Sequence, residues 1–201
     1  MKYVMSDIHG CYDEYIRMLE LINFSDEDEL YILGDIFDRG NKPLEILDHV
    51  LGNKNIHLLK GNHEKMFEEA YESGDMSLWY YNGGGTTDVE IVNKSEGYEE
   101  MLYKYIKKLP FVKVIDKFIL VHAGLYFPNN CNELTIEEFI NIQEEDICLW
   151  DRSNVGSIDN TFKDYKVIVG HTPVQSITNS YEDIKIIHHG SAIYIDCGCV
   201  F

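Results

Sequence analysis

Six short hydrophobic runs, each bounded by Gly, Asp or Asn, constrain the fold of this 201-residue chain more than any other feature. Their apolar and β-branched residues follow one another without strict alternation, which is typical of strands buried on both faces. Segments with helical spacing of apolar residues fill the intervals. The sequence therefore predicts an α/β fold in layers, with central β-sheets flanked by helices. The predicted strands are Lys2–Met5, Leu30–Leu33, Ile56–Leu59, Phe118–Val121, Val167–Val169 and Ala192–Ile195.

Five segments between these runs are predicted to be helical. One of them starts with a capping-box pattern, Thr135 followed by Glu138. Residues 74–98 break the alternation, because three consecutive glycines predict a loop there, which could cap the substrate side. We expect one domain over residues 1–201. The predicted helices are Tyr12–Ile22, Pro43–Leu51, Glu64–Glu72, Glu99–Leu109 and Thr135–Ile142.

Polar motifs begin where five of the hydrophobic runs end. Ligands bind at the carboxyl ends of strands in α/β sheets, so we expect these motifs to meet at one edge. Carboxylate, imidazole and amide groups from separate loops suit a pair of divalent cations. The pattern predicts a two-metal phosphoester hydrolase. The motifs are Asp7-Ile8-His9-Gly10, Gly34-Asp35-Ile36-Phe37-Asp38-Arg39-Gly40, Gly61-Asn62-His63-Glu64, His122-Ala123-Gly124 and Gly170-His171-Thr172.

The residue types also predict how two cations could be shared. Asp7 and His9, two residues apart, can chelate one cation, and the Asp35 carboxylate can bridge two cations about 3.5–4 Å apart. The remaining donors, Asn62, His122 and His171, would complete the second site. Cations placed in this way lower the pKa of a shared water, and the resulting hydroxide can attack phosphorus in line with the leaving group.

The order of these motifs resembles the calcineurin-like metallophosphoesterases. Within that group it is most similar to the bacterial-type serine/threonine phosphoprotein phosphatases and to their relatives, the symmetrical dinucleoside tetraphosphatases. The resemblance runs from Asp7 to about Asp196 and implies a layered fold with the active site at the carboxyl edges of the strands. It implies the same division of the metal ligands, with Asp35 on both cations.

The resemblance also implies roles for residues that do not bind metal. His63 would be the general acid for the leaving alkoxide, oriented by Asp38. Arg39 and Arg152 would bind the non-bridging phosphate oxygens. Arginine is scarce among the 17 basic residues, which favours a need for bidentate phosphate contacts at these two positions. Asp196 resembles a position near the metals and could support a ligand histidine.

Several alternatives stay open at this point. The ligand set favours Mn²⁺ and would also accept Fe or Zn. The leading substrate is phosphoserine or phosphothreonine in a protein, and the alternative is a dinucleoside polyphosphate such as diadenosine tetraphosphate. Trp79, Tyr80, Tyr81 and Tyr126 are candidates for stacking on a base. A catalytically silent metal-binding module would be expected to lack a ligand, the acid or an arginine, and every such position is filled.

Composition bounds the partners and the compartment. A formal net charge of −18 opposes binding to nucleic acid. The first strand starts at Lys2, and no apolar stretch is long enough to span a membrane, so we expect neither a signal peptide nor a membrane partner. Five cysteines without framework spacing predict free thiols in a reducing cytoplasm. The oligomeric state is left open.

Overall fold

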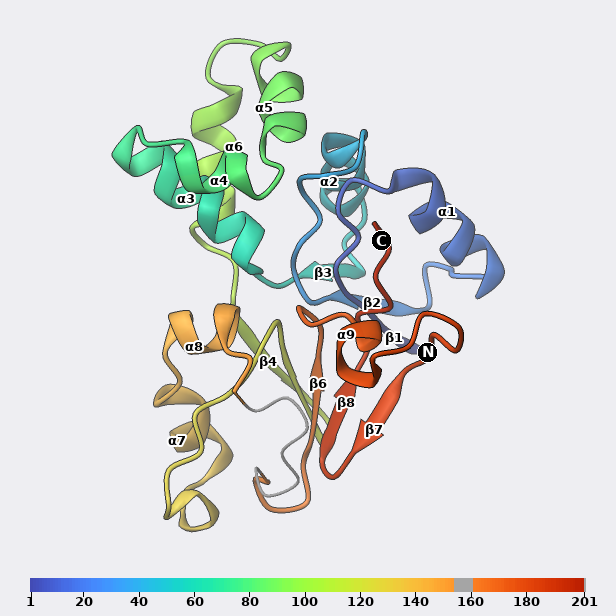
Figure 1. The fold of residues 1–201 in the computed structure, drawn as a ribbon, viewed down its shortest axis with the longest axis vertical. Helices are drawn as coiled ribbons and strands as arrows, with labels where there is room; N and C mark the ends of the chain where they lie inside the picture. Colours follow the sequence, from blue (N-terminus) through green and yellow to red (C-terminus); the bar gives the residue numbers. More distant parts are fainter. Residues whose placement is uncertain (154–160, 201) are drawn as a thin grey trace. The chain divides into compact units, whose positions relative to one another are not determined.

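The structure, a computed structural model, describes residues 1–153 and 161–200 (Figure 1). They form two compact units: unit 1 is Met1–Leu109 with the last residues of the chain from Cys199, and unit 2 is Pro110–Gly198. Each unit has a β-sheet and a hydrophobic core of its own. The predicted α/β fold, with sheets flanked by helices, is confirmed. The single domain over residues 1–201 stays a prediction.

The sheet of unit 1 is parallel. Its strands are β1 (Lys2–Met5), β2 (Glu29–Ile32) and β3 (Ile56–Leu58), in that order. Helices α1 (Tyr12–Leu21) and α2 (Pro43–Gly52) connect them. The register places Met5 beside Ile32 and Ile32 beside Leu58, so all three strands end at the same level. The loops that follow them therefore start side by side.

Four further helices complete unit 1: α3 (Asn62–Ser73), α4 (Ser77–Tyr81), α5 (Gly85–Val92) and α6 (Tyr98–Ile106). They form the green group in Figure 1, in which α3 packs against α4 and α6. The loop predicted for residues 74–98 is wrong for most of that range, because α4 and α5 occupy it. The turn between them, and the short segments 74–76 and 93–97, keep an irregular backbone.

Unit 2 contains a mixed five-stranded sheet. Its order is β4 (Val112–Ile115), β5 (Phe118–Val121), β6 (Lys166–Val169), β8 (Ala192–Tyr194) and β7 (Ile187–His189). The three central strands are parallel, and the outer two pair antiparallel to their neighbours. Val121, Val169 and Tyr194 are in register, so the parallel strands again end level with one another.

The helical segments of unit 2 pack on this sheet. They are the 3₁₀ turn η1 (Cys131–Glu133) and the helices α7 (Ile136–Asn141), α8 (Glu145–Trp150) and α9 (Val174–Thr178). The predicted capping box is present, because Thr135 Oγ1 accepts the Glu138 N–H and the Glu138 carboxylate accepts the Thr135 N–H. In the core, the rings of Phe139 and Phe162 stack at 4.1 Å between centroids.

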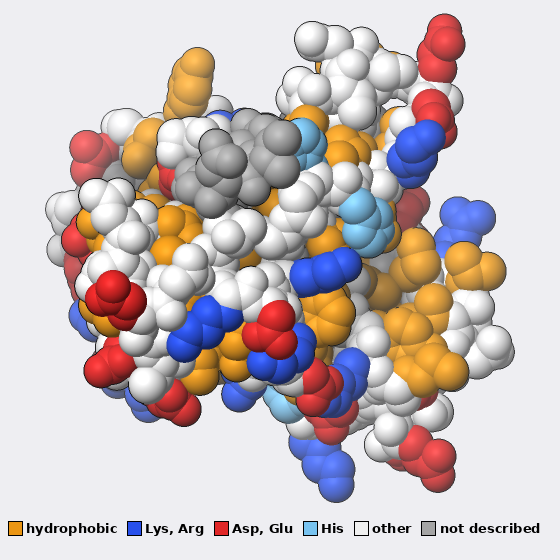
Figure 2. Space-filling model, turned by 90° about the horizontal axis from the view of Figure 1, so that it is seen from below, with side chains coloured by type: hydrophobic (Ala, Val, Ile, Leu, Met, Phe, Trp, Pro, Cys, Tyr) orange, Lys and Arg blue, Asp and Glu red, His pale blue; other side chains and the backbone are white. Residues whose placement is uncertain are grey.

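Three features of the described residues concern membrane crossing, the cysteines and surface charge. Among the described residues, no helix has both the length and the apolar character needed to cross a bilayer. No disulfide joins the five cysteines, all of which lie within the described residues. Acidic and basic side chains are interspersed on the face shown in Figure 2.

Candidate active site

The first two motif loops of unit 1 are joined through their backbones. Three N–H groups of the loop after β1 donate to carbonyls of the loop after β2: Asp7 to Gly34 at 3.3 Å, His9 to Asp35 at 2.8 Å and Gly10 to Ile36 at 2.8 Å. These bonds continue the parallel pairing of β1 and β2 beyond the ends of the strands. The predicted ligands Asp7, His9 and Asp35 are thereby held on neighbouring segments.

This joining requires unusual backbone conformations. Asp7, His9, Asp35, Asp38 and Arg39 all have φ between 47° and 69°, in the left-handed region that costs a non-glycine residue roughly 1–2 kcal/mol. Strained residues of this kind cluster at functional sites, where the surrounding structure determines their conformation. A Cβ on Gly40 would lie only 2.2 Å from the His9 carbonyl oxygen, so the close approach of the two loops requires glycine there.

Three side chains of unit 1 form a buried cluster of metal-type donors. The ligand atoms of His9, Asp35 and His63 lie within 4.8 Å of one another. His9 Nε2 is 3.6 Å from the Asp35 carboxylate, and His9 Nδ1 lies 3.0 Å from the Phe37 carbonyl. Donation from Nδ1–H to that carbonyl fixes the tautomer and leaves the Nε2 lone pair facing the cluster. Asp7 and Asn62, also predicted as ligands, are buried in the same unit.

The charge of this cluster is compatible with divalent cations. Burial, and the nearby Asp7 and Glu64 carboxylates, raise the pKa of Asp35 well above its usual value. Burial also lowers the pKa of His9 to about 3, so this imidazole is neutral at physiological pH. A bound cation stabilises crowded carboxylates in the deprotonated form, and it binds an imidazole in the neutral form. The residues present therefore fit the pair of divalent metals that the sequence predicts.

His63 of this cluster also forms a buried pair with Asp38. His63 Nδ1 lies 2.6 Å from Asp38 Oδ2, and both side chains are almost fully buried. Burial raises the pKa of Asp38 to about 7, although hydrogen bonds from Thr87 and Trp79 oppose that rise. The arrangement agrees in geometry with the orienting contact that the sequence resemblance implies for this pair.

Arg39 contacts two histidines of unit 1, the two that belong to the donor cluster. Its Nη1 lies 2.7 Å from His9 Nε2, and its Nη2 lies 3.0 Å from His63 Nε2. The guanidinium thus lies between a predicted metal ligand and the predicted general acid. An anion bound by this guanidinium would be adjacent to both.

Glu64 has a role in unit 1 that sequence reasoning missed. Its carboxylate is fully buried and accepts the backbone N–H groups of Asp35 at 2.8 Å, Ile36 at 3.0 Å and Gly61 at 2.7 Å. One side chain therefore holds the loop after β2 against the start of α3. Its place three residues after Gly61, the residue that caps α3, is the capping-box spacing that could have revealed it.

In unit 2, three predicted site residues follow the three parallel strands, and a fourth, Arg152, follows α8. His122 comes directly after β5, and its Nε2 lies 3.2 Å from Nδ1 of His171, which follows β6. Arg152 Nε donates to His171 Nε2 at 3.1 Å. Asp196 follows β8, is buried, and accepts the Gly198 N–H at 2.8 Å. Support of a ligand histidine by Asp196 stays a prediction.

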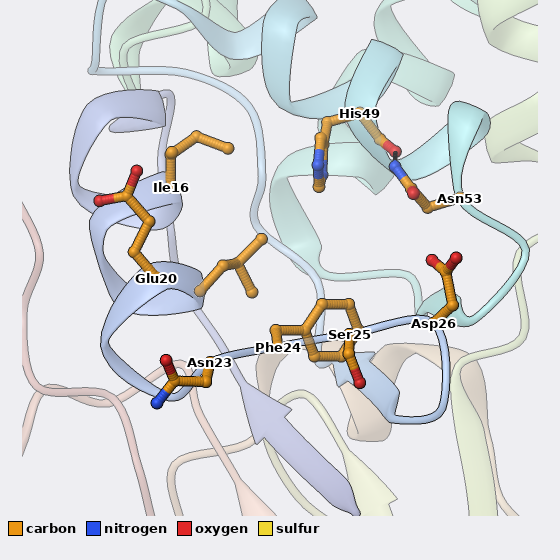
Figure 3. A pocket seen from close by; sticks show the side chains of 9 residues that line it. Ile16, Glu20, Asn23, Phe24, Ser25, Asp26, His49 and Asn53 are labelled. Atoms are coloured by element: carbon orange, nitrogen blue, oxygen red, sulfur yellow. Dashed lines mark hydrogen bonds between the residues drawn. The ribbon is translucent and has the colours of Figure 1, made fainter.

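A separate hollow of about 510 Å³ lies in unit 1 between α1 and α2. Ile16 and Glu20 line it from α1, and His49 and Asn53 line it from α2 (Figure 3). The Asn53 amide donates to the His49 carbonyl at 2.7 Å. None of the residues that line this hollow belongs to the five motifs.

The level strand ends, the joined loops and the buried carboxylate and imidazole donors form an arrangement that could hold metal ions. The calcineurin-like phosphoesterase family model matches residues 3–194, and the chain belongs to this family. It is therefore a phosphoesterase of the hydrolase class, and the predicted family resemblance is confirmed. Membership implies divalent metal ions.

Two curated relatives carry different names. Serine/threonine-protein phosphatase 2 of Salmonella typhimurium is 30% identical over 98% of this chain and 86% of its own length. The symmetrical bis(5'-nucleosyl)-tetraphosphatase of Salmonella paratyphi B is 43% identical over 61% of this chain. That match spans only 43% of the tetraphosphatase.

Among solved structures, a putative diadenosine tetraphosphatase superposes with a TM-score of 0.66 at 18% identity, over 98% of this chain and 83% of that one. A similarity at this identity shows the shared fold.

Proposed function

We propose that this chain is a dinuclear-metal phosphomonoesterase that acts on phosphoserine or phosphothreonine in proteins. One observation carries the catalytic part of the proposal: the buried Asp38–His63 pair lies beside Arg39 and the donor cluster around Asp35. A phosphate held by the guanidinium would bring its leaving oxygen close to His63 Nε2.

Six residues would hold the metals. Asp7, His9 and Asp35 would bind one cation, and Asp35 with Asn62, His122 and His171 would bind the other. Mn²⁺ suits this mixture of carboxylate, amide and imidazole, and Fe or Zn could replace it. When bound, such cations lower the pKa of a water molecule and polarise the phosphoryl oxygens, which prepares an in-line displacement.

The other residues would bind the phosphate and move a proton. Arg39 and Arg152 would bind non-bridging phosphate oxygens, since guanidinium geometry matches two of them at once. His63 Nε2 would give its proton to the leaving alkoxide, and the Asp38 carboxylate on Nδ1 would stabilise the charged imidazolium before transfer. This proton transfer is worth about 10²–10⁴-fold in rate in other enzymes.

The share of each relative's length that is similar to this chain supports a phosphoprotein substrate. The similarity to the named phosphatase covers 86% of that protein, whereas the similarity to the named tetraphosphatase covers 43% of it. In addition, Trp79 is only 1% exposed, so its ring is not accessible for stacking on a base. Two other aromatic residues of the same helix, Tyr80 and Tyr81, are exposed.

Symmetrical cleavage of a dinucleoside tetraphosphate is the second candidate. It is favoured by the 43% identity over 128 residues to a named tetraphosphatase. The metal ligands would serve both reactions, because only the leaving group differs. We expect no nucleic-acid or membrane partner for either activity, and a cytoplasmic location suits both.

The test is steady-state hydrolysis by Mn²⁺-loaded protein, comparing a phosphoserine or phosphothreonine peptide with diadenosine tetraphosphate. We expect a higher kcat/KM for the peptide and a loss of about 10²–10⁴-fold in His63→Asn. His188→Asn, at an exposed histidine of β7, is the matched control and should retain full activity. Preference for the dinucleotide would establish the second candidate, and an unchanged rate in His63→Asn would refute the proposed acid.

A further inference from the structure

The segment from Trp79 to Thr87 contacts Asp38, the hydrogen-bond partner of His63. It contains the end of α4, a glycine turn and the start of α5. Trp79 and Thr87 are each only 1% exposed, and both direct polar groups at the Asp38 side chain. Neither residue belongs to a motif that the sequence suggested for catalysis.

The Asp38 carboxylate receives donors from three elements. Trp79 Nε1–H lies 3.1 and 2.9 Å from its two oxygens, and Thr87 Oγ1 donates to Oδ1 at 2.6 Å. His63 Nδ1 lies at 2.6 Å from Oδ2. Thr87 Oγ1 also accepts the Asp38 backbone N–H at 2.9 Å. Together, these bonds fix the rotamer of Asp38 and the left-handed backbone on which it sits.

The glycine turn is fitted to the neighbouring residue, Arg39. The Arg39 N–H donates to the Gly83 carbonyl at 3.2 Å. A Cβ on Gly83 would lie 2.9 Å from Arg39 Cγ, and a Cβ on Gly84 would lie 2.5 Å from the Trp79 ring. The turn therefore lies so close to the indole and to the arginine side chain that only glycine fits at these two positions.

We infer that Trp79 and Thr87 are positioning residues, which hold Asp38, and through it the His63 ring, in the orientation needed to protonate the leaving group. The inference rests on the proposed role of His63 as general acid. It gives the segment a task that differs from covering the substrate or stacking on it, because the indole faces Asp38 and packs edge-on against Phe67 at 5.2 Å between ring centroids.

The test uses Trp79→Phe and Thr87→Val, which remove a donor and preserve most of the shape. Metal-loaded proteins are compared on a phosphoserine peptide and on p-nitrophenyl phosphate. The alkoxide of serine needs a proton from the enzyme, whereas nitrophenolate leaves without one. We expect each variant to lose about tenfold in kcat on the peptide, the loss for one hydrogen bond to a charged group, and far less on the nitrophenyl ester, with KM unchanged.

Two controls separate this inference from a general packing effect. Tyr103→Phe removes another aromatic donor to a carboxylate of unit 1, that of Glu72, and should alter neither rate. Trp79→Phe added to His63→Asn should cause no further loss, because the two residues act through one proton transfer. Thermal unfolding of each variant verifies folding, and Thr87→Val carries the test if Trp79→Phe does not fold.

Equal losses on both substrates, or additive losses in the double variant, would overturn the positioning role. If His63→Asn itself shows no dependence on the leaving group, the proposed function fails instead. A leaving-group dependence in His63→Asn that is missing in both donor variants would refute only the inference about Trp79 and Thr87.

Discussion

The carboxyl edges of the two sheets carry different chemistry, although both are formed by parallel strands that end level. The edge in unit 1 carries buried acids, with Asp7 and Asp35 in its motif loops. The edge in unit 2 carries two neighbouring imidazoles, His122 and His171, with Asp196 after the third strand. One edge thus supplies carboxylates and the other supplies imidazole nitrogens.

The difference extends to how the donors are supported. In unit 1, the Glu64 carboxylate fixes the backbone of the ligand loop, and the Asp38 carboxylate fixes the His63 ring. In unit 2, His171, a proposed ligand, is contacted by the His122 imidazole and by a cation, Arg152. Burying several carboxylates close together costs folding free energy unless each one accepts hydrogen bonds or binds a metal. This cost explains the many hydrogen bonds to the carboxylates of unit 1.

The largest effect should come from removing the carboxylate of Asp35, which is proposed to bind both cations. We expect Asp35→Asn to reduce hydrolysis to the background of the assay and to lower the metal content, because its carboxylate is the only proposed ligand to both cations. His122→Asn, on the imidazole edge, removes a ligand to one cation and should leave a measurable rate. Steady-state rates and elemental analysis of the metal-loaded proteins measure both effects.

Asp48→Asn is the control for these two variants, because the Asp48 side chain is exposed. Its carboxylate lies 3.8 Å from the Lys94 ammonium, in a surface ion pair. Equal losses in Asp35→Asn and His122→Asn would mean that the two edges contribute alike. The contrast between them would then lie in their hydrogen bonds alone.

A smaller effect should follow from loosening the support of the acidic edge. Glu64→Gln replaces one carboxylate oxygen by an NH2 group, which cannot accept a backbone N–H. The loop that bears Asp35 therefore loses part of its support. We expect metal affinity to fall by about 10–100-fold, as for other residues that orient metal ligands. Titration of the metal-free protein with Mn²⁺, followed by calorimetry, measures this.

Glu69→Gln, in the same helix, is the matched control because the Glu69 side chain is 52% exposed. If the two variants bind Mn²⁺ equally well, the three hydrogen bonds of Glu64 stabilise the fold without tuning the metal site.

The smallest effect should appear as a pH dependence of the stabilisation by metal. The raised pKa of Asp35 means that its protonated form favours the folded, metal-free protein at low pH. That contribution is lost as pH rises from the ordinary value of 3.8 through the raised pKa. Cations bind the deprotonated carboxylate, so the stabilisation by metal should increase over the same range.

At 100 times the dissociation constant, Mn²⁺ should add about 2.7 kcal/mol to the free energy of unfolding. Each kcal/mol corresponds to about 2–4 °C in Tm for a chain of this size. We expect a larger Tm increase at pH 8 than at pH 5 when both are measured with the same Mn²⁺ concentration. An equal increase at both pH values would show that proton release from the acidic edge does not accompany binding.

Most of the strands and long helices could be predicted because their signals are local. The six strands expected from hydrophobic runs match β1, β2, β3, β5, β6 and β8 to within one residue at each end. β4 and β7 were missed, since each lies at an edge of its sheet and mixes polar with apolar residues. The short helices α4, α5, α8 and α9 were missed as well, because five to eight residues give too little periodicity.

Residues 79–87 illustrate why local signals fail. The consecutive glycines indicate a loop when they are taken alone, and Gly85 nevertheless starts a helix. Arg39 lies against Gly83, and this contact depends on packing rather than on the neighbouring sequence. The same applies to Trp79, whose partner Asp38 is 41 residues away along the chain.

The sequence by itself determined the fold class, the family and the candidate residues, because hydrophobic runs, turn residues and metal-type donors are written in short stretches. Only the tertiary structure decided which donors satisfy which acceptors. It assigned Glu64 to three backbone N–H groups, Trp79 and Thr87 to Asp38, and Arg39 to two histidines. Buried polar groups must find partners wherever packing brings them, and packing joins residues that no local pattern connects.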